Sequence, residues 1–299
     1  MKQPLQSHGI STADDFDACV VRSDSSSIRE FTFTVADFKR ISGLIHARAG
    51  IALNDGKRDL VYSRIGRRLR ALRMTSFREY LDQLESSGDD AEWQAFTNAL
   101  TTNLTSFFRE EHHFVRLAEL LAKRAPGERM LLWCSAASTG EEPYSIAITA
   151  AEVFGTLKPP VSILATDIDT QVLDTASQGV YADERIERLS EERKRRFFRR
   201  GTGENQGLVR VVDELRELVT FRQLNLLDPR YPVRGPFRAI FCRNVMIYFD
   251  KPTQYQVLSR MVPVLADDGL FFAGHSESFF HAGDLIESCG RTIYRKAQR

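Results

Sequence analysis

The chain has 299 residues, of which 42% are apolar and 27% charged, and its formal net charge is +1. This composition excludes a wholly disordered chain, and the length suggests about two domains. A net charge this small gives no overall field, so a charged partner must be met by a local patch. The sequence has no apolar run long enough to span a bilayer and no apolar signal region at its N-terminus, which predicts a cytoplasmic protein without direct membrane insertion.

The N-terminal third divides into an arm and a helical region. Residues 1–30 are polar and predict a flexible arm. Over 31–100, apolar residues recur at helical spacing in four stretches, which predicts a small all-α domain. The expected helices cover about 35–49, 57–73, 77–86 and 91–100.

The second of these helices has an almost entirely basic face. Its apolar stripe consists of Val61, Ile65, Leu69 and Leu72. Asp59 is the only acid between Gly56 and Phe77, and like charges at helical spacing cost roughly a few tenths of a kcal/mol per pair. A solvated face is one interpretation, but a nearly neutral chain that accepts this cost favours an acidic partner. The residues expected to bind that partner are Arg64, Arg67, Arg68, Arg70 and Arg73.

A polar and aromatic segment, 101–114, follows the helical domain. We expect Phe107 and Phe108 to wall an apolar or aromatic pocket, with Arg109 beside them. The alternative is a connector between domains in which Arg109 pairs with Glu110.

No metal site is expected. His112 and His113 are adjacent, and adjacent residues on a helix do not face one another as metal ligands would. The cysteines are widely spaced and form no C-x-x-C pair, which predicts reduced thiols. They are Cys19, Cys134, Cys242 and Cys289.

An apolar run, Met130–Cys134, predicts a buried strand, and small residues over 135–140 predict a turn. Glu141 and Glu142 then open a helical pattern with Pro143 in its first turn. Strand, small-residue turn and helix are typical of the first unit of a nucleotide-binding α/β fold, because the small residues let a ligand approach the backbone. The turn lacks G-x-G-x-x-G and the lysine of a phosphate-binding loop, and the two acids favour a positively charged ligand.

The next predicted strand, Val161–Ala165, leads to two acids. An acid at the end of the second strand of such a fold binds the ribose diol of a nucleoside, and we expect Asp167 to do so. Asp169 is expected to cap the helix that follows.

The α/β alternation is interrupted over about 177–218. A strongly basic helix is expected over Ser190–Arg200, then a glycine-rich loop and a strand over Leu208–Val212. This pattern predicts an inserted β-subdomain, whose exposed strand edges could accept a peptide as an added strand.

Two later strands end shortly before an asparagine. Val219–Gln223 precedes Asn225, and Phe237–Cys242 precedes Asn244. An asparagine at the carboxyl edge of a strand can read the amide-like edge of an adenine. Tyr248 lies a few residues past Phe237–Cys242, at the edge where active sites of open α/β sheets lie.

The C-terminal part completes the expected sheet. A helix over Thr253–Leu265 and a strand over Gly269–Ala273 precede a last strand, Arg291–Arg295, which is expected to be antiparallel. Because position 278 is serine, the segment after Ala273 is not G-x-S-x-G, so no hydrolase elbow is predicted and His275 is expected to be structural.

Five segments, in this order, closely resemble the chemotaxis receptor methyltransferases of the CheR type. They are LTTNLTSFFRE (100–110), SAASTGEEPYSIAI (135–148), ATDID (165–169), FCRNVMIYFD (241–250) and AGHSE (273–277). The resemblance covers about 31–299. It implies an α/β fold with a small N-terminal all-α domain and a Rossmann-like methyltransferase domain over 101–299. That domain would have a mostly parallel sheet, an antiparallel last strand and an inserted β-subdomain.

The resemblance also implies an enzyme that transfers the methyl group of S-adenosylmethionine to glutamate side chains of bacterial chemoreceptors, giving methyl esters and S-adenosylhomocysteine. Arg109 and Tyr248 would lie beside the reacting methyl group, and Glu141 would pair with the ammonium of the cofactor. The implied cofactor contacts are Asn103, Thr105, Arg109, Glu141, Asp167, Asn225, Leu226, Arg243 and Asn244. Receptor helices would meet the arginines of the second helix, and the inserted subdomain could bind a C-terminal receptor tail peptide.

Two other functions stay open. A nucleic acid could be the methyl acceptor, but the basic face lacks interleaved aromatic residues and the net charge is near zero, so we expect no nucleic-acid partner. A cofactor-binding sensor without turnover is the other alternative, and the presence of Arg109 and Tyr248 argues against it.

Overall fold

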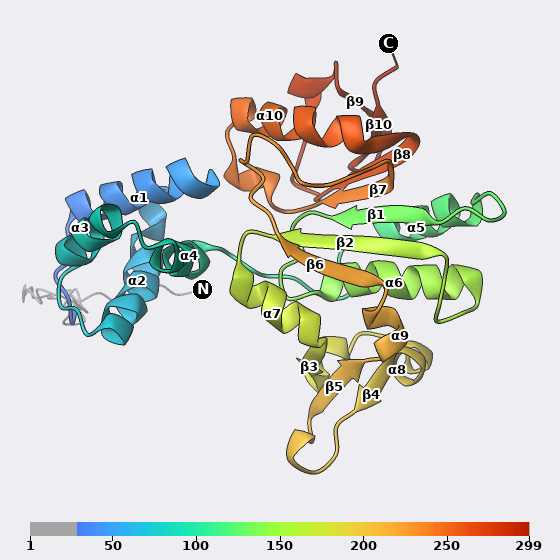
Figure 1. The fold of residues 1–299 in the computed structure, drawn as a ribbon, viewed down its shortest axis with the longest axis horizontal. Helices are drawn as coiled ribbons and strands as arrows, with labels where there is room; N and C mark the ends of the chain where they lie inside the picture. Colours follow the sequence, from blue (N-terminus) through green and yellow to red (C-terminus); the bar gives the residue numbers. More distant parts are fainter. Residues whose placement is uncertain (1–28, 299) are drawn as a thin grey trace, which may run out of the picture.

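The computed structural model describes residues 29–298, so the predicted N-terminal arm lies almost entirely outside the described residues. The described chain forms a helical bundle, a larger domain around a seven-stranded sheet, and a small three-stranded sheet attached to that domain (Figure 1). This architecture confirms the predicted fold class. Within 29–298, no helix combines the length and the apolar character needed to cross a lipid bilayer.

Four helices form the N-terminal bundle. They are α1 (Val35–Ala49), α2 (Arg58–Leu72), α3 (Phe77–Ser87) and α4 (Asp90–Leu100). Thr34 caps α1 through its hydroxyl, which accepts the Asp37 N–H, and Gly50 ends the helix in the left-handed conformation. Apolar side chains from the helices share one core. Of the predicted apolar stripe of α2, Val61, Ile65 and Leu69 are buried, whereas Leu72, the last residue of the helix, is 36% exposed.

The central sheet has the strand order β6–β2–β1–β7–β8–β10–β9. Its strands are β1 (Met130–Cys134), β2 (Val161–Asp167), β6 (Val219–Gln223), β7 (Phe237–Cys242), β8 (Leu265–Ala273), β9 (Ile286–Gly290) and β10 (Ile293–Lys296). The five strands from β6 to β8 pair in parallel, and β10 is antiparallel to both its neighbours, as expected for the last strand. The carboxyl ends of the parallel strands therefore meet at one edge.

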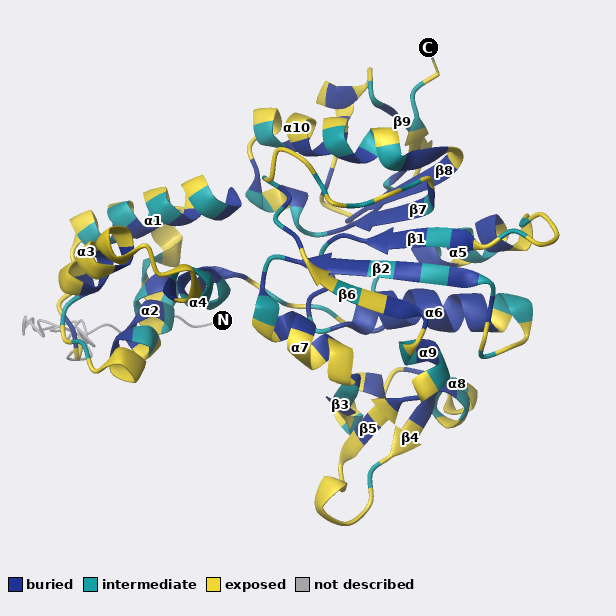
Figure 2. Ribbon diagram, in the orientation of Figure 1, coloured by how far each residue is buried: buried dark blue, intermediate teal, exposed yellow. Residues whose placement is uncertain are grey.

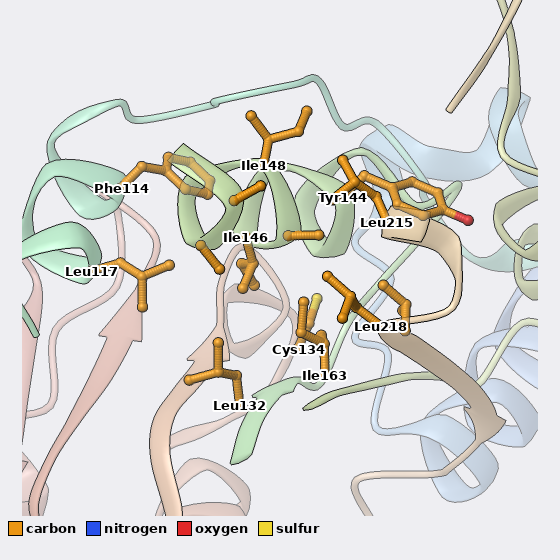
Figure 3. Packing of buried hydrophobic residues seen from close by; sticks show 14 of the residues in the cluster. Phe114, Leu117, Leu132, Cys134, Tyr144, Ile146, Ile148, Ile163, Leu215 and Leu218 are labelled. Carbon is orange, nitrogen blue, oxygen red and sulfur yellow. The ribbon is translucent and has the colours of Figure 1, made fainter. Parts of the chain in front are cut away.

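Helices cover both faces of this sheet (Figures 1 and 2). They include α5 (His112–Ala122), α6 (Glu141–Phe154), α7 (Thr170–Gln178) and α10 (Lys251–Met261). Leu132 and Cys134 of β1 pack in a core with α5 and α6 (Figure 3), whereas Trp133 belongs to a second core with α10. A strand buried on both faces needs consecutive apolar residues, which is the pattern of the β1 sequence.

The inserted β-subdomain is confirmed, but one of its elements differs from the prediction. It contains β3 (Val180–Ala182), α8 (Glu191–Phe197), β4 (Phe198–Arg200), β5 (Leu208–Val211) and α9 (Asp213–Arg216), with the strand order β3–β5–β4. The basic helix expected over Ser190–Arg200 ends at Phe197. Phe198 instead pairs with Val211 of β5, and both side chains are buried, so packing on the small sheet overrides continuation of the helix.

Two C-terminal elements also differ from the prediction. The helix expected to reach Leu265 ends at Met261, because Pro263 lies in the 3₁₀ turn that follows and Leu265 already begins β8. Strand β9 was not predicted. It is an edge strand with only Ile286 buried, so its sequence lacks an alternating apolar pattern.

Candidate active site

A pocket opens at the carboxyl edge of the central sheet, where the helical bundle meets the larger domain. Residues that follow β1, β2, β6 and β7 line it, and the linker 101–105 closes one side. Ala49 and Ile51, from the end of α1 and the segment after it, also line the pocket. Neither was predicted, because nothing in their local sequence indicates that another domain packs there. Ligands of open α/β sheets bind at this position.

Most of the predicted site residues line this pocket. They are Asn103, Thr105, Arg109, Asp167, Asn225, Leu226, Arg243, Asn244 and Tyr248. These residues come from the interdomain linker, its continuation toward α5, and the loops after three different strands. The sheet topology brings them together.

Glu141, the predicted partner of a cofactor ammonium, does not line the pocket. Its carboxylate is fully buried and accepts hydrogen bonds from Arg185 and from the Thr139 hydroxyl at 2.6 Å. The neighbouring acid, Glu142, lines the pocket and pairs with Arg243. Successive side chains on a helix differ by about 100° in direction, and the sequence alone does not indicate which of two adjacent acids faces a ligand.

Arg109 is fixed in the pocket wall by its neighbours. Phe108 and Glu110 have φ angles of 53° and 58°, a region that non-glycine residues rarely adopt. Arg109 Nη1 donates to the Leu104 carbonyl at 3.0 Å, and the Arg109 carbonyl accepts from Arg243 Nη2 at 2.5 Å. The alternative in which Arg109 pairs with Glu110 is not found. Glu110 pairs with Arg243 instead.

Arg243 joins two loops through buried charges. Its guanidinium lies 3.5 Å from Glu110 Oε2 and 2.5 Å from Glu142 Oε2. Burial acts to raise the pKa of Glu110, but the Arg243 guanidinium and His275 outweigh it and hold that pKa below its ordinary value. This arrangement keeps Glu110 ionised beside Arg109.

The two adjacent histidines lie closer to Glu110 than expected. Ligand atoms of Glu110, His112 and His113 lie within 4.8 Å of one another, so the expectation that the histidines cannot face a common point is wrong. Both Nε2 atoms lie near the Arg291 carbonyl, at 3.1 and 3.3 Å. Because the Arg243 guanidinium beside Glu110 would repel a cation, we assign no metal to this group.

Asp167 is a buried carboxylate at the end of β2. Its Oδ2 accepts the Ser138 N–H at 2.8 Å, and its Oδ1 accepts the Asp169 N–H at 3.0 Å. Burial raises the pKa of Asp167 to about 6, although these two amides favour the ionised form. Asp169 caps α7, as expected, by accepting the N–H groups of Gln171 and Val172.

Asn103 ties the linker to the larger domain, and Asn225 ties that domain to the helical bundle. Asn103 Nδ2 donates to Asp169 Oδ2 at 2.8 Å, and Asn225 Nδ2 donates to the Arg48 carbonyl at 2.8 Å. Asn225 Oδ1 also accepts the Leu227 N–H at 3.0 Å. The side-chain amide of Asn225 therefore already has partners on both sides, and this arrangement does not favour adenine recognition by that amide.

Tyr248 lies in the 3₁₀ turn Met246–Tyr248 and is partly buried. Its carbonyl accepts the Ala52 N–H at 3.2 Å, which connects the turn to the helical bundle. Within residues 29–298, the Tyr248 hydroxyl makes no hydrogen bond, so it is available to a ligand in the pocket.

Two of the five arginines predicted to bind an acidic partner instead contact groups of the helical bundle or of the residue that follows α4. Arg64 donates to the Thr101 carbonyl, and Arg68 pairs with the buried Glu92, which also accepts from the Tyr80 hydroxyl at 2.8 Å. Their positions therefore indicate a structural contribution.

The other three arginines lie on the exposed surface. Arg70 pairs with Glu30 at 2.9 Å. Arg67 and Arg73 are exposed and form no ion pair within the described part of the chain. Their charges are accessible to a partner.

Phe107 and Phe108 do not line the pocket, so the expectation for them is wrong. Phe107 packs edge-on against Tyr181 and Phe198 of the inserted subdomain, with ring centroids 5.1 and 5.4 Å away. Phe108 packs against Phe114 of α5. The aromatic pair thus fixes the Arg109 loop to α5 and to the inserted subdomain. Tyr181 and Phe198, the partners of Phe107, are distant in sequence.

Comparisons with known proteins agree with this architecture. The family described as "CheR methyltransferase, SAM binding domain" matches residues 103–295, and "CheR methyltransferase, all-alpha domain" matches residues 36–101. Chemotaxis protein methyltransferase 2 of Pseudomonas aeruginosa is 55% identical over 270 residues, which cover 90% of this chain and 96% of that protein. The chemotaxis protein methyltransferase of Escherichia coli is 55% identical over 259 residues, covering 87% of this chain and 90% of that protein.

A solved TehB-like SAM-dependent methyltransferase from Corynebacterium glutamicum covers 60% of this chain and 84% of its own, at 14% identity and a TM-score of 0.34, too low to bear on function. The family matches span both domains, and the two relatives align over most of their length. The chain therefore belongs to the CheR methyltransferase family.

Proposed function

We propose that the protein transfers the methyl group of S-adenosylmethionine to glutamate side chains of chemoreceptors, forming glutamate methyl esters and S-adenosylhomocysteine. The observation that carries this proposal is the convergence of Arg109, Asp167, Asn244 and Tyr248 on one pocket at the carboxyl edge of the sheet. The names of the relatives, which are chemotaxis protein methyltransferases, support a chemoreceptor as the substrate.

The residues of the pocket fit this cofactor, which supplies an electrophilic methyl group on a sulfonium when bound. Asp167 would accept the ribose hydroxyls, since its carboxylate lies at the end of the second strand. Arg109 would pair with the carboxylate of the amino-acid moiety. Apolar side chains that could pack on adenine are Ile168, Leu226 and Val245.

The chemistry requires orientation more than proton transfer. A glutamate side chain has a pKa near 4.3, so at pH 7 the carboxylate is favoured roughly five-hundred-fold and no general base is needed. The Tyr248 hydroxyl would donate a hydrogen bond to the attacking carboxylate and aim it. Arg109 would limit the repulsion between that carboxylate and the one on the cofactor. Orientation of this kind supplies on the order of 7–11 kcal/mol.

The receptor would dock against the exposed side of α2. Arg67 and Arg73 offer uncompensated positive charge there, which complements a glutamate-rich helix and would steer its approach. The edge strands β3 and β4 of the small sheet could accept a receptor tail peptide as an added strand. We place the reaction in the cytoplasm, where the methyl-accepting helices of such receptors lie.

The test uses the full chain, methyl-labelled S-adenosylmethionine and membranes that carry unmethylated chemoreceptors. We expect label on the receptor that mild base releases, because a carboxyl methyl ester is base-labile. Arg109→Ala is the matched control and should transfer no label. Label on nucleic acid instead of receptor would contradict the proposed substrate. Cofactor binding by calorimetry without any transfer would favour a sensor.

A further inference from the structure

The segment that follows β8 contacts the loop that carries Asn244 and Tyr248. In this segment Glu277 is 4% exposed and lies outside the pocket wall. Its Oε2 accepts the Asn244 N–H at 3.0 Å and the Gly274 N–H at 2.5 Å. One buried carboxylate therefore holds two backbone donors at the ends of β7 and β8.

The contact between these two loops is close. A Cβ atom on Gly274 would lie 2.3 Å from Asn244 Nδ2 and 2.9 Å from the Asn244 backbone nitrogen, so only glycine fits. Asn244 itself has a φ of 58°, in the left-handed region. The hydrogen bond from its N–H to Glu277 stabilises that conformation, and it thereby fixes where the next residues of the loop begin.

Gln254 holds the part of the same loop that follows Asn244. It lies on α10, is buried, and its Nε2 donates to the carbonyls of Met246 and Phe249 at 2.9 and 3.0 Å. These two carbonyls flank Tyr248 in sequence. The Glu277 carboxylate thus accepts a backbone N–H of this loop, and the Gln254 amide donates to two of its backbone carbonyls.

Burial raises the pKa of Glu277, while the amides of Gly274, Asn244, Met246 and Ile247 act in the opposite direction. The amides that favour the charged carboxylate all belong to these two loops. This is consistent with a group that serves the loop backbone and no solvent or ligand.

We propose that Glu277 and Gln254 are positioning residues for methyl transfer. Glu277 fixes Asn244 at the pocket, and Gln254 fixes the turn Met246–Tyr248 so that the Tyr248 hydroxyl faces the substrate. The inference rests on the proposed function, because it assumes that Tyr248 acts on the attacking carboxylate.

Two variants separate the two contributions. Glu277→Gln keeps the shape but weakens the acceptor, so the dissociation constant for S-adenosylhomocysteine, measured by calorimetry, should rise on the order of tenfold together with a loss of kcat. Gln254→Met removes the donor to the carbonyls of Met246 and Phe249, which lie after Asn244 in the loop. We therefore expect kcat to fall on the order of tenfold to hundredfold, with little change in the dissociation constant for S-adenosylhomocysteine. Glu287→Gln, which removes a surface carboxylate paired with Arg295, is the matched control and should behave as wild type.

A spectroscopic readout tests the loop independently of turnover. The protein is labelled with 3-fluorotyrosine, and the ¹⁹F resonance of Tyr248 is assigned by its loss in Tyr248→Phe. In both variants this resonance should shift while the other tyrosine resonances stay. If Glu277→Gln fails to fold, Gln254→Met still tests whether the turn Met246–Tyr248 needs its buried donor.

An unmoved Tyr248 resonance, or wild-type kcat in folded Gln254→Met, would overturn the positioning role. A shifted resonance with wild-type turnover would show that the loop moves without consequence, and it would remove Tyr248 from the mechanism as well. If the wild-type protein methylates no receptor, the proposed function fails, whereas the resonance shifts and cofactor affinities still test the support of the loop.

Discussion

Cofactor binding should depend on pH because of Asp167. Burial raises the pKa of this group to about 6 in the free protein. A carboxylate that accepts two ribose hydroxyls must be ionised, so only the ionised fraction is competent to bind. That fraction is about 0.9 at pH 7 and about 0.09 at pH 5, which predicts a dissociation constant about tenfold larger at the lower pH.

Calorimetry with S-adenosylhomocysteine measures this effect directly. Titrations near pH 6 in two buffers of different ionisation enthalpy should show the release of about half a proton per cofactor bound. Asp167→Asn should bind more weakly and lose this proton release. A wild-type dissociation constant that stays constant between about pH 5 and pH 7, without proton release, would refute the reasoning.

The same group gives folding stability a pH dependence of known sign. The pKa of Asp167 rises from 3.8 to about 6 on folding, so the native state holds the proton more tightly. Its stabilising contribution is complete below about pH 4 and is lost as the pH rises through about 6, a loss of about 3 kcal/mol. In the absence of cofactor, Asp167→Asn should therefore flatten the pH dependence of the free energy of unfolding over this range. A variant whose profile parallels wild type would show that another group is responsible.

Three further outcomes follow from the structure. Tyr248→Phe should lower kcat on the order of tenfold and leave the cofactor dissociation constant unchanged, because only the hydroxyl is lost. An unchanged kcat would contradict the proposed hydrogen bond from this hydroxyl to the attacking carboxylate. The KM for receptor should rise with salt, and Arg67→Glu with Arg73→Glu should raise it at low salt, whereas a salt-independent KM would contradict docking on α2. Phe107→Ala should lower the free energy of unfolding in urea by about 3–5 kcal/mol, because the buried ring packs on the inserted subdomain. Phe280→Ala, at a side chain 94% exposed, should change it by less than about 0.5 kcal/mol and serves as the control.

The parallel strands were predictable because burial on both faces leaves a strong pattern. Met130–Cys134 and Phe237–Cys242 are apolar nearly throughout, and the structure has strands with these bounds. The short strand Phe198–Arg200 carries no such pattern. It is a strand because it pairs with β5, a segment about ten residues further along the chain. The ends of strongly patterned elements were therefore accessible from sequence, and elements created by tertiary pairing were not.

The site was predictable where chemistry depends on strand ends. Asp167 is the last residue of β2 and Asn244 comes two residues after β7, and the parallel arrangement brings such positions to one edge. Side-chain direction was not predictable. Glu141 and Glu142 differ by one position, but only Glu142 lines the pocket. Asn225 makes an interdomain hydrogen bond, to the Arg48 carbonyl, that depends on how the helical bundle docks.

Backbone strain is concentrated around the pocket. Phe108, Glu110, Ser138 and Asn244 all have positive φ angles, and each lies in a loop that lines the pocket. Such conformations cost on the order of 1–3 kcal/mol each and persist only where the surroundings over-determine them.

Buried charges supply that constraint. Glu110 pairs with Arg243, the Ser138 N–H donates to Asp167, and the Asn244 N–H donates to Glu277. Each strained loop thus contacts a buried or partly buried acid within the protein before any ligand arrives. A ligand would then meet a backbone already in place, and the free energy of binding need not be used to order it. It follows that replacing Glu277, which lies outside the pocket wall, should disturb the pocket as much as replacing a residue in that wall.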